Sequence, residues 1–111
     1  MEEKIFIDDF HKVEMRVGEI LSAEPVEGSE KLLRLQVSFG SEKRQVVSGI
    51  RKHVGEPANL IGKRYAFATN LAPRSLMGLE SQAMLLAVGG DGETPFVILE
   101  APGGTPGSRV K

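Results

Sequence analysis

Leu33-Arg34-Leu35-Gln36-Val37-Ser38-Phe39 is the stretch that decides the fold of this chain. Its residues alternate between apolar and polar, which predicts a β-strand with one buried row of side chains and one exposed row. The apolar row, from Leu33 to Phe39, is expected to line a core. The polar row, Arg34, Gln36 and Ser38, is expected to face outwards.

Further strand patterns lie on both sides of this stretch. Residues 13–21 alternate around Gly18, which predicts a long strand with a bulge or sharp bend at that glycine. Residues 44–48, 65–69 and 96–99 also indicate strands, and the apolar run 83–88 is typical of a strand buried on both faces. Turns are expected at 40–41 and 89–92, a loop with one helical turn over 49–62, and an irregular tail over 101–107.

Five or six short strands with almost no helix predict an all-β protein, and at this size an OB-fold, a small Greek-key β-barrel of about five strands with short flanking segments. The 111 residues are expected to form one domain, 1–111. The barrel core is expected to contain Leu33, Leu35, Val37, Phe39, Phe67, Met84 or its neighbours, and Val97.

Composition excludes several classes of protein. The chain has no cysteine and two histidines, which removes disulfides, thiol nucleophiles and zinc ribbons and leaves little for a metal site. The longest apolar run, 83–88, is far shorter than the ~20 residues that span a bilayer. No basic segment followed by an apolar one opens the chain. We therefore expect a cytoplasmic protein with no cofactor, no metal and no membrane partner.

Three features could carry chemistry, and each has a simpler explanation. Asp8 and Asp9 are adjacent, so on an extended chain their carboxylates diverge, and a turn or helix cap is expected there. His53 has no obvious nucleophile or orienting carboxylate near it in sequence and is expected to be an exposed loop histidine. Residues 89–92 lack the Gly-Lys-Ser/Thr of a phosphate-binding loop. The sequence therefore predicts that the chain is not an enzyme.

Charge is distributed unevenly along the chain. The net charge is −1, but residues 1–30 sum to −6, residues 31–74 to +7 and residues 75–111 to −2. A basic central segment between two acidic ones indicates a surface for a polyanion, or else solvated side chains scattered around the domain. Five phenylalanines and one tyrosine are too few for a protein that stacks many consecutive bases, so an RNA with its own folded structure is the better ligand.

Four segments resemble motifs of the tRNA-binding domain family. Residues 8–18 (DDFHKVEMRVG) resemble its opening motif, 27–35 (EGSEKLLRL) its second and 44–50 (RQVVSGI) its third. Residues 70–84 (NLAPRSLMGLESQAM) are the most specific, and the resemblance covers about 7–111 with all four motifs in order. One departure is Ala83, where relatives often have glycine.

The resemblance implies an OB-fold that binds tRNA through its backbone and shape, with little preference among species. The family includes free-standing dimeric tRNA-binding proteins, the C-terminal domain of many methionyl-tRNA synthetases and endothelial-monocyte-activating-polypeptide-like domains. By similarity, the positions expected on the binding face are Lys31, Arg34, Ser48, Asn70, Ser81 and Met84. Electrostatics adds four exposed cations, Arg44, Arg51, Lys52 and Arg74. Ser48 and Asn70 could instead satisfy strand ends, and Met84 could instead belong to the core.

The resemblance also implies partners. A homodimer is expected through the segments of about 1–12 and 90–111. The leading hypothesis is a non-catalytic tRNA-binding protein that assists an aminoacyl-tRNA synthetase in trans, methionyl-tRNA synthetase above all. The alternatives are a dissociable tRNA-binding subunit of that synthetase and an export-related chaperone of the same family.

Overall fold

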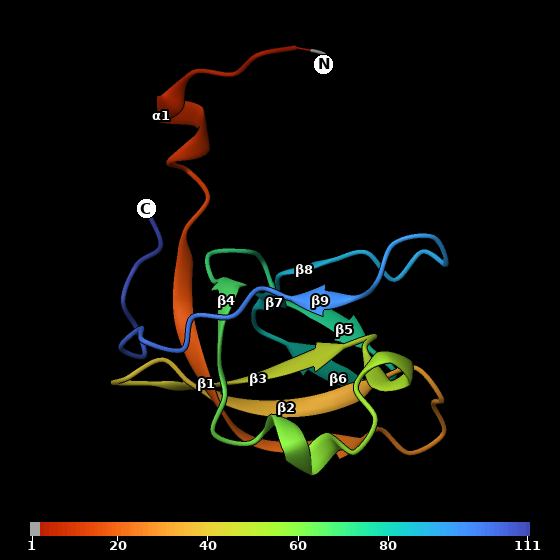
Figure 1. The fold of residues 1–111 in the computed structure, drawn as a ribbon. Helices are drawn as coiled ribbons and strands as arrows, with labels where there is room; N and C mark the ends of the chain where they lie inside the picture. The colour runs from red at the N-terminus through yellow and green to blue at the C-terminus, as the bar shows by residue number, and fades with distance from the viewer. Residues whose placement is uncertain (1–2) are drawn as a thin grey trace.

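The computed structural model describes residues 3–111 and leaves Met1 and Glu2, which belong to the predicted N-terminal dimer segment, outside the described residues. Figure 1 shows a curled antiparallel sheet with a short helix standing away from it. The elements are α1 (Ile7–Phe10), β1 (Met15–Pro25), β2 (Leu33–Ser38), β3 (Lys43–Ser48), the 3₁₀ turns η1 (Arg51–His53) and η2 (Pro57–Leu60), β4 (Arg64–Ala68), β5 (Arg74–Leu76), β6 (Leu79–Ser81), β7 (Met84–Leu85), β8 (Ala87–Val88) and β9 (Val97–Ile98).

The sheet has a Greek-key order. Its five strands lie in the order β3-β2-β1-β4-β7, so β4 returns through residues 49–63 to lie beside β1. Gln82 and Ser81 connect β3 to the chain before β7: Gln82 N donates to Gln45 O at 2.9 Å, and Val47 N donates to Ser81 Oγ at 3.0 Å. The predicted all-β OB-fold is confirmed.

The alternating stretch that predicted the fold forms β2 as expected. Leu33, Leu35 and Val37 are fully buried, and the polar residues between them are half-exposed. Phe39 follows them into the core, where its ring meets the edge of the Phe67 ring at 5.3 Å between centroids. This aromatic pair fills the interior between β2 and β4.

Gly18 has a different role from the predicted one. The register of β1 against β2 shifts at Leu21, between Ile20 and Ser22, so the bulge is three residues beyond the glycine. A Cβ at position 18 would lie 2.6 Å from Val37 Cγ1 and 2.8 Å from Phe67 Cε1. Glycine is present because β1 crosses the core too closely to allow a side chain.

The C-terminal third departs most from prediction. The run 83–88 is not buried on both faces, because it breaks into β7 and β8 and Val88 is half-exposed. Val97, which was expected in the core, is 54% exposed, and its neighbour Ile98 is buried there instead. The expected core position at Met84 or its neighbours is confirmed for the neighbours, because Ala83 and Leu85 are buried in the core while Met84 is 45% exposed. Continuous apolar sequence carries no alternation, so it could not show which residues point inwards.

The hairpin of β5 and β6 was not predicted. It turns at Met77 and Gly78, with φ angles of +50° and +80°. Positive φ at both central residues is typical of a two-residue hairpin whose twist matches that of its strands. Asn-Gly would have indicated such a turn, but Met-Gly does not.

The tail from Ala101 to Gly107 has no strand, as predicted, but its last residue and the residues that follow it are hydrogen-bonded to β1. Gly107 N donates to Val17 O at 2.8 Å, Val17 N donates to Ser108 O at 2.9 Å, and Val110 N donates to Met15 O at 2.8 Å. The tail therefore covers the first half of β1, where β2 does not reach.

Candidate RNA-binding cleft

One cleft brings together residues from five parts of the chain, one of which is Leu32, directly before β2. It has a volume of about 280 Å³ and lies between the end of β3, the β5–β6 hairpin, β7 and the segment after β4. Its lining is mostly apolar: Leu32, Val47, Ser48, Gly49, Leu71, Ala72, Arg74, Leu76, Ser81, Ala83, Met84 and Leu85. Four predicted site residues are among them, namely Ser48, Arg74, Ser81 and Met84.

Three predicted cations do not line this cleft but belong to segments that adjoin its lining. Lys31 directly precedes Leu32, and Arg51 and Lys52 follow shortly after Gly49. The two segments are joined, because Arg51 N donates to Lys31 O at 3.0 Å and the Arg51 guanidinium donates to Ser29 O. Within residues 3–111, no carboxylate forms an ion pair with Lys31, Arg51, Lys52 or Arg74. These four side chains keep their positive charge available to a ligand.

Arg34 and Arg44 carry charge that the protein itself partly neutralises. Arg34 lies on the outward row of β2 and pairs with Glu24. Arg44 pairs with Glu42 at 2.8 Å, donates to the carbonyls of Thr69 and Gln82, and lies over the Phe39 ring at 5.5 Å. Its guanidinium therefore joins β3 to the ends of β4 and β6. Arg64, another cation of the basic segment, pairs with Glu19 at 2.9 Å.

Asn70 has both ends of its amide engaged within the protein. Glu14 N donates to Asn70 Oδ1 at 2.7 Å, and Asn70 Nδ2 donates to Lys12 O at 2.6 Å. This arrangement ties the N-terminal segment to the end of β4, directly before Leu71 of the cleft. Ser81 is also engaged, since its hydroxyl accepts from Val47 N at 3.0 Å. Both residues hold the walls in place, whatever contact they make with a ligand.

Next to this junction, Glu14 is held in its charged form. Its carboxylate accepts from Arg16 Nε at 2.8 Å and from the Thr69 hydroxyl at 2.8 Å. These hydrogen bonds, that of Arg16 first, lower the pKa of Glu14 from 4.5 to about 2. Asp91 shows the same effect in the 89–92 turn, where the amides of Thr94 and Glu93 lower the pKa of its carboxyl.

The residues considered above for catalysis or metal binding, Asp8, Asp9, His53 and 89–92, do not line the cleft. Asp8 and Asp9 form the opening turn of α1. His53 is exposed, in η1, and stacks on Phe96 with 4.4 Å between ring centroids. In the part of the chain that the structure describes, no three His, Cys, Asp or Glu residues come together in a way that could hold a metal ion. No helix in residues 3–111 is long and apolar enough to cross a membrane.

The sequence reasoning missed the apolar part of the cleft. Leu32, Leu71, Ala72 and Leu76 were not among the predicted site residues, because a polyanion site is indicated by cations and the family resemblance implied Met84 alone among apolar residues. Three of them, Leu71, Ala72 and Leu76, lie inside the 70–84 motif. Leu71 and Ala72 directly precede Pro73, where no strand alternation buries an apolar side chain. Apolar residues beside this proline were the feature of the sequence that could have indicated an apolar cleft.

Residues 15–109 match the family described as "Putative tRNA binding domain". The chain belongs to the tRNA-binding domain family. The domain that defines this family is a non-catalytic RNA-binding module. Curated relatives are methionine–tRNA ligases: that of Clostridium tetani is 44% identical over 98% of this chain and 17% of its own length, and that of Thermotoga maritima is 47% identical over 96% and 16%. The chain thus spans about one sixth of the length of these relatives.

Solved structures share the fold over nearly the whole chain. A methionyl-tRNA synthetase-related protein from Pyrococcus horikoshii is 35% identical, with a TM-score of 0.91 over 99% of this chain and all of that one. The chaperone CsaA from Bacillus anthracis is 22% identical, with a TM-score of 0.84 over 98% of this chain and all of that one. At that identity the second likeness concerns the fold alone.

Proposed function

We propose that this chain is a non-catalytic tRNA-binding domain, 1–111, that binds tRNA at the cleft. The observation that carries the proposal is a cleft lined by Arg74, with Lys31, Arg51 and Lys52 in the adjoining segments, in a chain that belongs to the tRNA-binding domain family. None of these four cations forms an ion pair within residues 3–111. Cations in loops can contact phosphates while the rest of the fold stays rigid. Of the other predicted residues, Ser48, Ser81 and Met84 line the cleft, and Arg44 and Asn70 hold neighbouring segments together. Arg34 lies outside the cleft and pairs with Glu24.

We further propose a cytoplasmic protein that works with an aminoacyl-tRNA synthetase. Its similarity to methionine–tRNA ligases favours methionyl-tRNA synthetase as the partner, either in trans or as a dissociable subunit. Pull-down from the native cell distinguishes these arrangements, because a subunit co-purifies with the synthetase at fixed stoichiometry.

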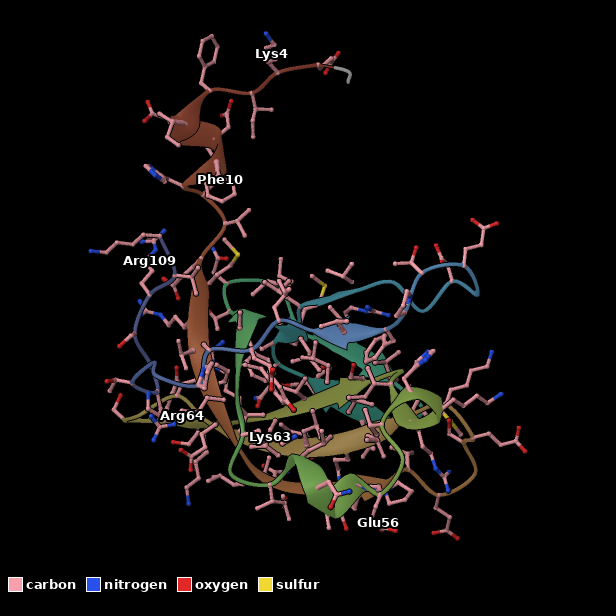
Figure 2. The ribbon with its side chains drawn as sticks, in the orientation of Figure 1. Lys4, Phe10, Glu56, Lys63, Arg64 and Arg109 are labelled. Carbon is pink, nitrogen blue, oxygen red and sulfur yellow. The ribbon has the colours of Figure 1, made fainter. Side chains whose placement is uncertain are left out.

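We propose a homodimer as well, formed through the segments of about 1–12 and 90–111 and supported by the N-terminal arm, residues 3–14. Figure 2 shows Lys4 and Phe10 on this arm, away from the barrel that carries Lys63 and Arg64. Ile5, Phe6 and Ile7 are 66%, 81% and 64% exposed. A four-residue helix with such exposed apolar side chains is not stable by itself, so a partner surface is needed to cover it. Arg109, which donates to His11 O at 3.1 Å, brings the C-terminal segment to the same place.

A gel shift tests the proposed function. Bulk tRNA is compared with single-stranded and double-stranded RNA of equal phosphate content at two salt concentrations. We expect tRNA to bind more tightly than either control and its affinity to fall with salt, because cations that contact phosphates release counterions. Equal binding of all three RNAs, or salt-independent binding, would refute recognition of folded tRNA by this cleft. A chaperone predicts no salt-dependent tRNA complex at all.

A further inference from the structure

The cleft has the size and surface of a site for one small flat group. Its volume of about 280 Å³ lies just below the range of pockets that enclose drug-sized ligands. Of the residues that line it, Ala83 and Leu85 are buried, whereas Leu71 and Met84 are each 45% exposed. Apolar side chains that remain exposed around a hollow indicate a ligand that covers them.

The aromatic residues exclude an ordinary stacking surface. Phe39, Tyr65 and Phe67 are in the core, and Phe96 is half-buried against His53. Phe6 and Phe10 lie on the arm. All six aromatic side chains are thereby placed, and none lines the cleft. Consecutive unstacked bases therefore have no rings to stack on.

The charges around the cleft favour a nucleotide over an apolar peptide. Arg74 is the charged residue among those that line it, and Lys31, Arg51 and Lys52 belong to segments that adjoin the lining residues Leu32 and Gly49. No carboxylate lines the cleft in residues 3–111. An apolar hollow with cations on its wall and rim matches a base together with the phosphates on either side of it.

We propose that the cleft takes up a single unstacked base of the bound RNA, held by the Leu71, Leu76 and Met84 side chains, while Arg74 and the Lys31–Lys52 group contact the flanking phosphates. This inference rests on the proposed tRNA binding. The Ser81 hydroxyl is engaged with β3, which leaves Ser48 as the side-chain hydroxyl lining the cleft that no hydrogen bond within residues 3–111 engages. With so few polar groups, the cleft accepts any of the four bases.

A tryptophan placed in the cleft tests the proposal, because the natural chain has none. Leu71→Trp puts the reporter on an exposed side of the cleft, where it does not disturb the core. Ile61→Trp is the matched control, since Ile61 is 51% exposed and outside the cleft. The probes are bulk tRNA, each nucleoside 5′-monophosphate, a blunt RNA duplex and an apolar hexapeptide.

We expect tRNA and all four monophosphates to quench Leu71→Trp emission at least twofold, and the duplex, whose bases remain stacked, to leave it unchanged. Ile61→Trp should respond to none of them. As a second test, Met84→Ala should weaken tRNA binding about fivefold, the effect of slightly more than one buried methylene, without changing the salt slope.

Two results would overturn the base site. One is tRNA binding of natural affinity to Leu71→Trp, measured by anisotropy, with no quenching. The other is an emission shift with the hexapeptide and none with RNA, which would assign the cleft to protein chains. Failure of the natural chain to bind tRNA at all would instead refute the proposed function on which the base site rests.

Discussion

Arg44 and Arg74 come from the same basic segment but have opposite surroundings. Arg44 is surrounded by Glu42, two backbone carbonyls and the Phe39 ring. Arg74 is exposed on the wall of the cleft. Sequence position alone does not separate a cation that joins strands from one that can meet a ligand. The ion-pair and hydrogen-bond partners of each guanidinium group distinguish the two.

Glu14 gives a prediction at the scale of a single residue. Because its folded pKa is about 2 and its ordinary value 4.5, the charged carboxylate stabilises the folded state above pH 4.5. This contribution is lost as the pH falls from 4.5 towards 2. In that range, unfolding of the natural chain should take up as much as one proton more than unfolding of Glu14→Gln.

Urea unfolding of both proteins at several pH values between 2 and 7 measures this difference. Glu3→Gln is the control, because Glu3 is exposed on the arm. The stability curves of the natural chain and Glu14→Gln should converge at low pH. Parallel curves over the whole range would contradict the assigned hydrogen bonds.

At the scale of elements, prediction was accurate where a pattern of period two existed. β2, β3 and β4 lie within a residue of their expected bounds. The bulge, the β5–β6 hairpin and the division of 83–88 were wrong or missed, because each depends on packing between elements rather than on a local pattern. Gly18 is an example: the sequence shows a glycine, and only the approach of Val37 and Phe67 explains it.

The C-terminal tail gives a prediction at this scale. Gly107 has φ of +91°, and a Cβ there would lie 2.3 Å from Phe39 O. Gly107→Ala should therefore lower the free energy of unfolding by about 2 kcal/mol or more, through positive φ and the displaced tail. Gly103→Ala is the matched control, since its Cβ would meet nothing within 4 Å. Thermal unfolding of both variants measures the effect, and equal stability would show that the tail does not hold β1.

For the candidate site, the sequence provided the cations and the motif but not their grouping. Four of the ten predicted residues line the cleft, and Lys31, Arg51 and Lys52 belong to segments that adjoin it. Asn70, Arg34 and Arg44 are engaged in hydrogen bonds or ion pairs elsewhere. The +7 segment does not become one basic patch, because Arg34, Arg44 and Arg64 pair with acids of other segments or of their own. Ion pairs between residues far apart in the sequence cannot be predicted before the pairing of the strands is known.

At the scale of the whole molecule, the arm predicts the oligomeric state. Phe6→Asp should convert a dimer to a monomer without loss of the fold, since Phe6 is 81% exposed and contributes nothing to the barrel core. Light scattering at micromolar concentration measures this, with Ile61→Asp as a control. A natural chain that is already monomeric would remove the proposed dimer. Deleting the tail is a poorer test, because residues 107–110 are bonded to β1.

The measurement that tests the central claim most directly is a set of tRNA titrations at several salt concentrations with the natural chain, Arg74→Ala and Lys63→Ala. Arg74 is on the wall of the cleft, and Lys63 lies elsewhere on the barrel. We predict that Arg74→Ala weakens binding to all tRNAs about equally and lowers the salt slope by about one, while Lys63→Ala changes little. An unchanged affinity and slope for Arg74→Ala would contradict the cleft as the tRNA-binding site.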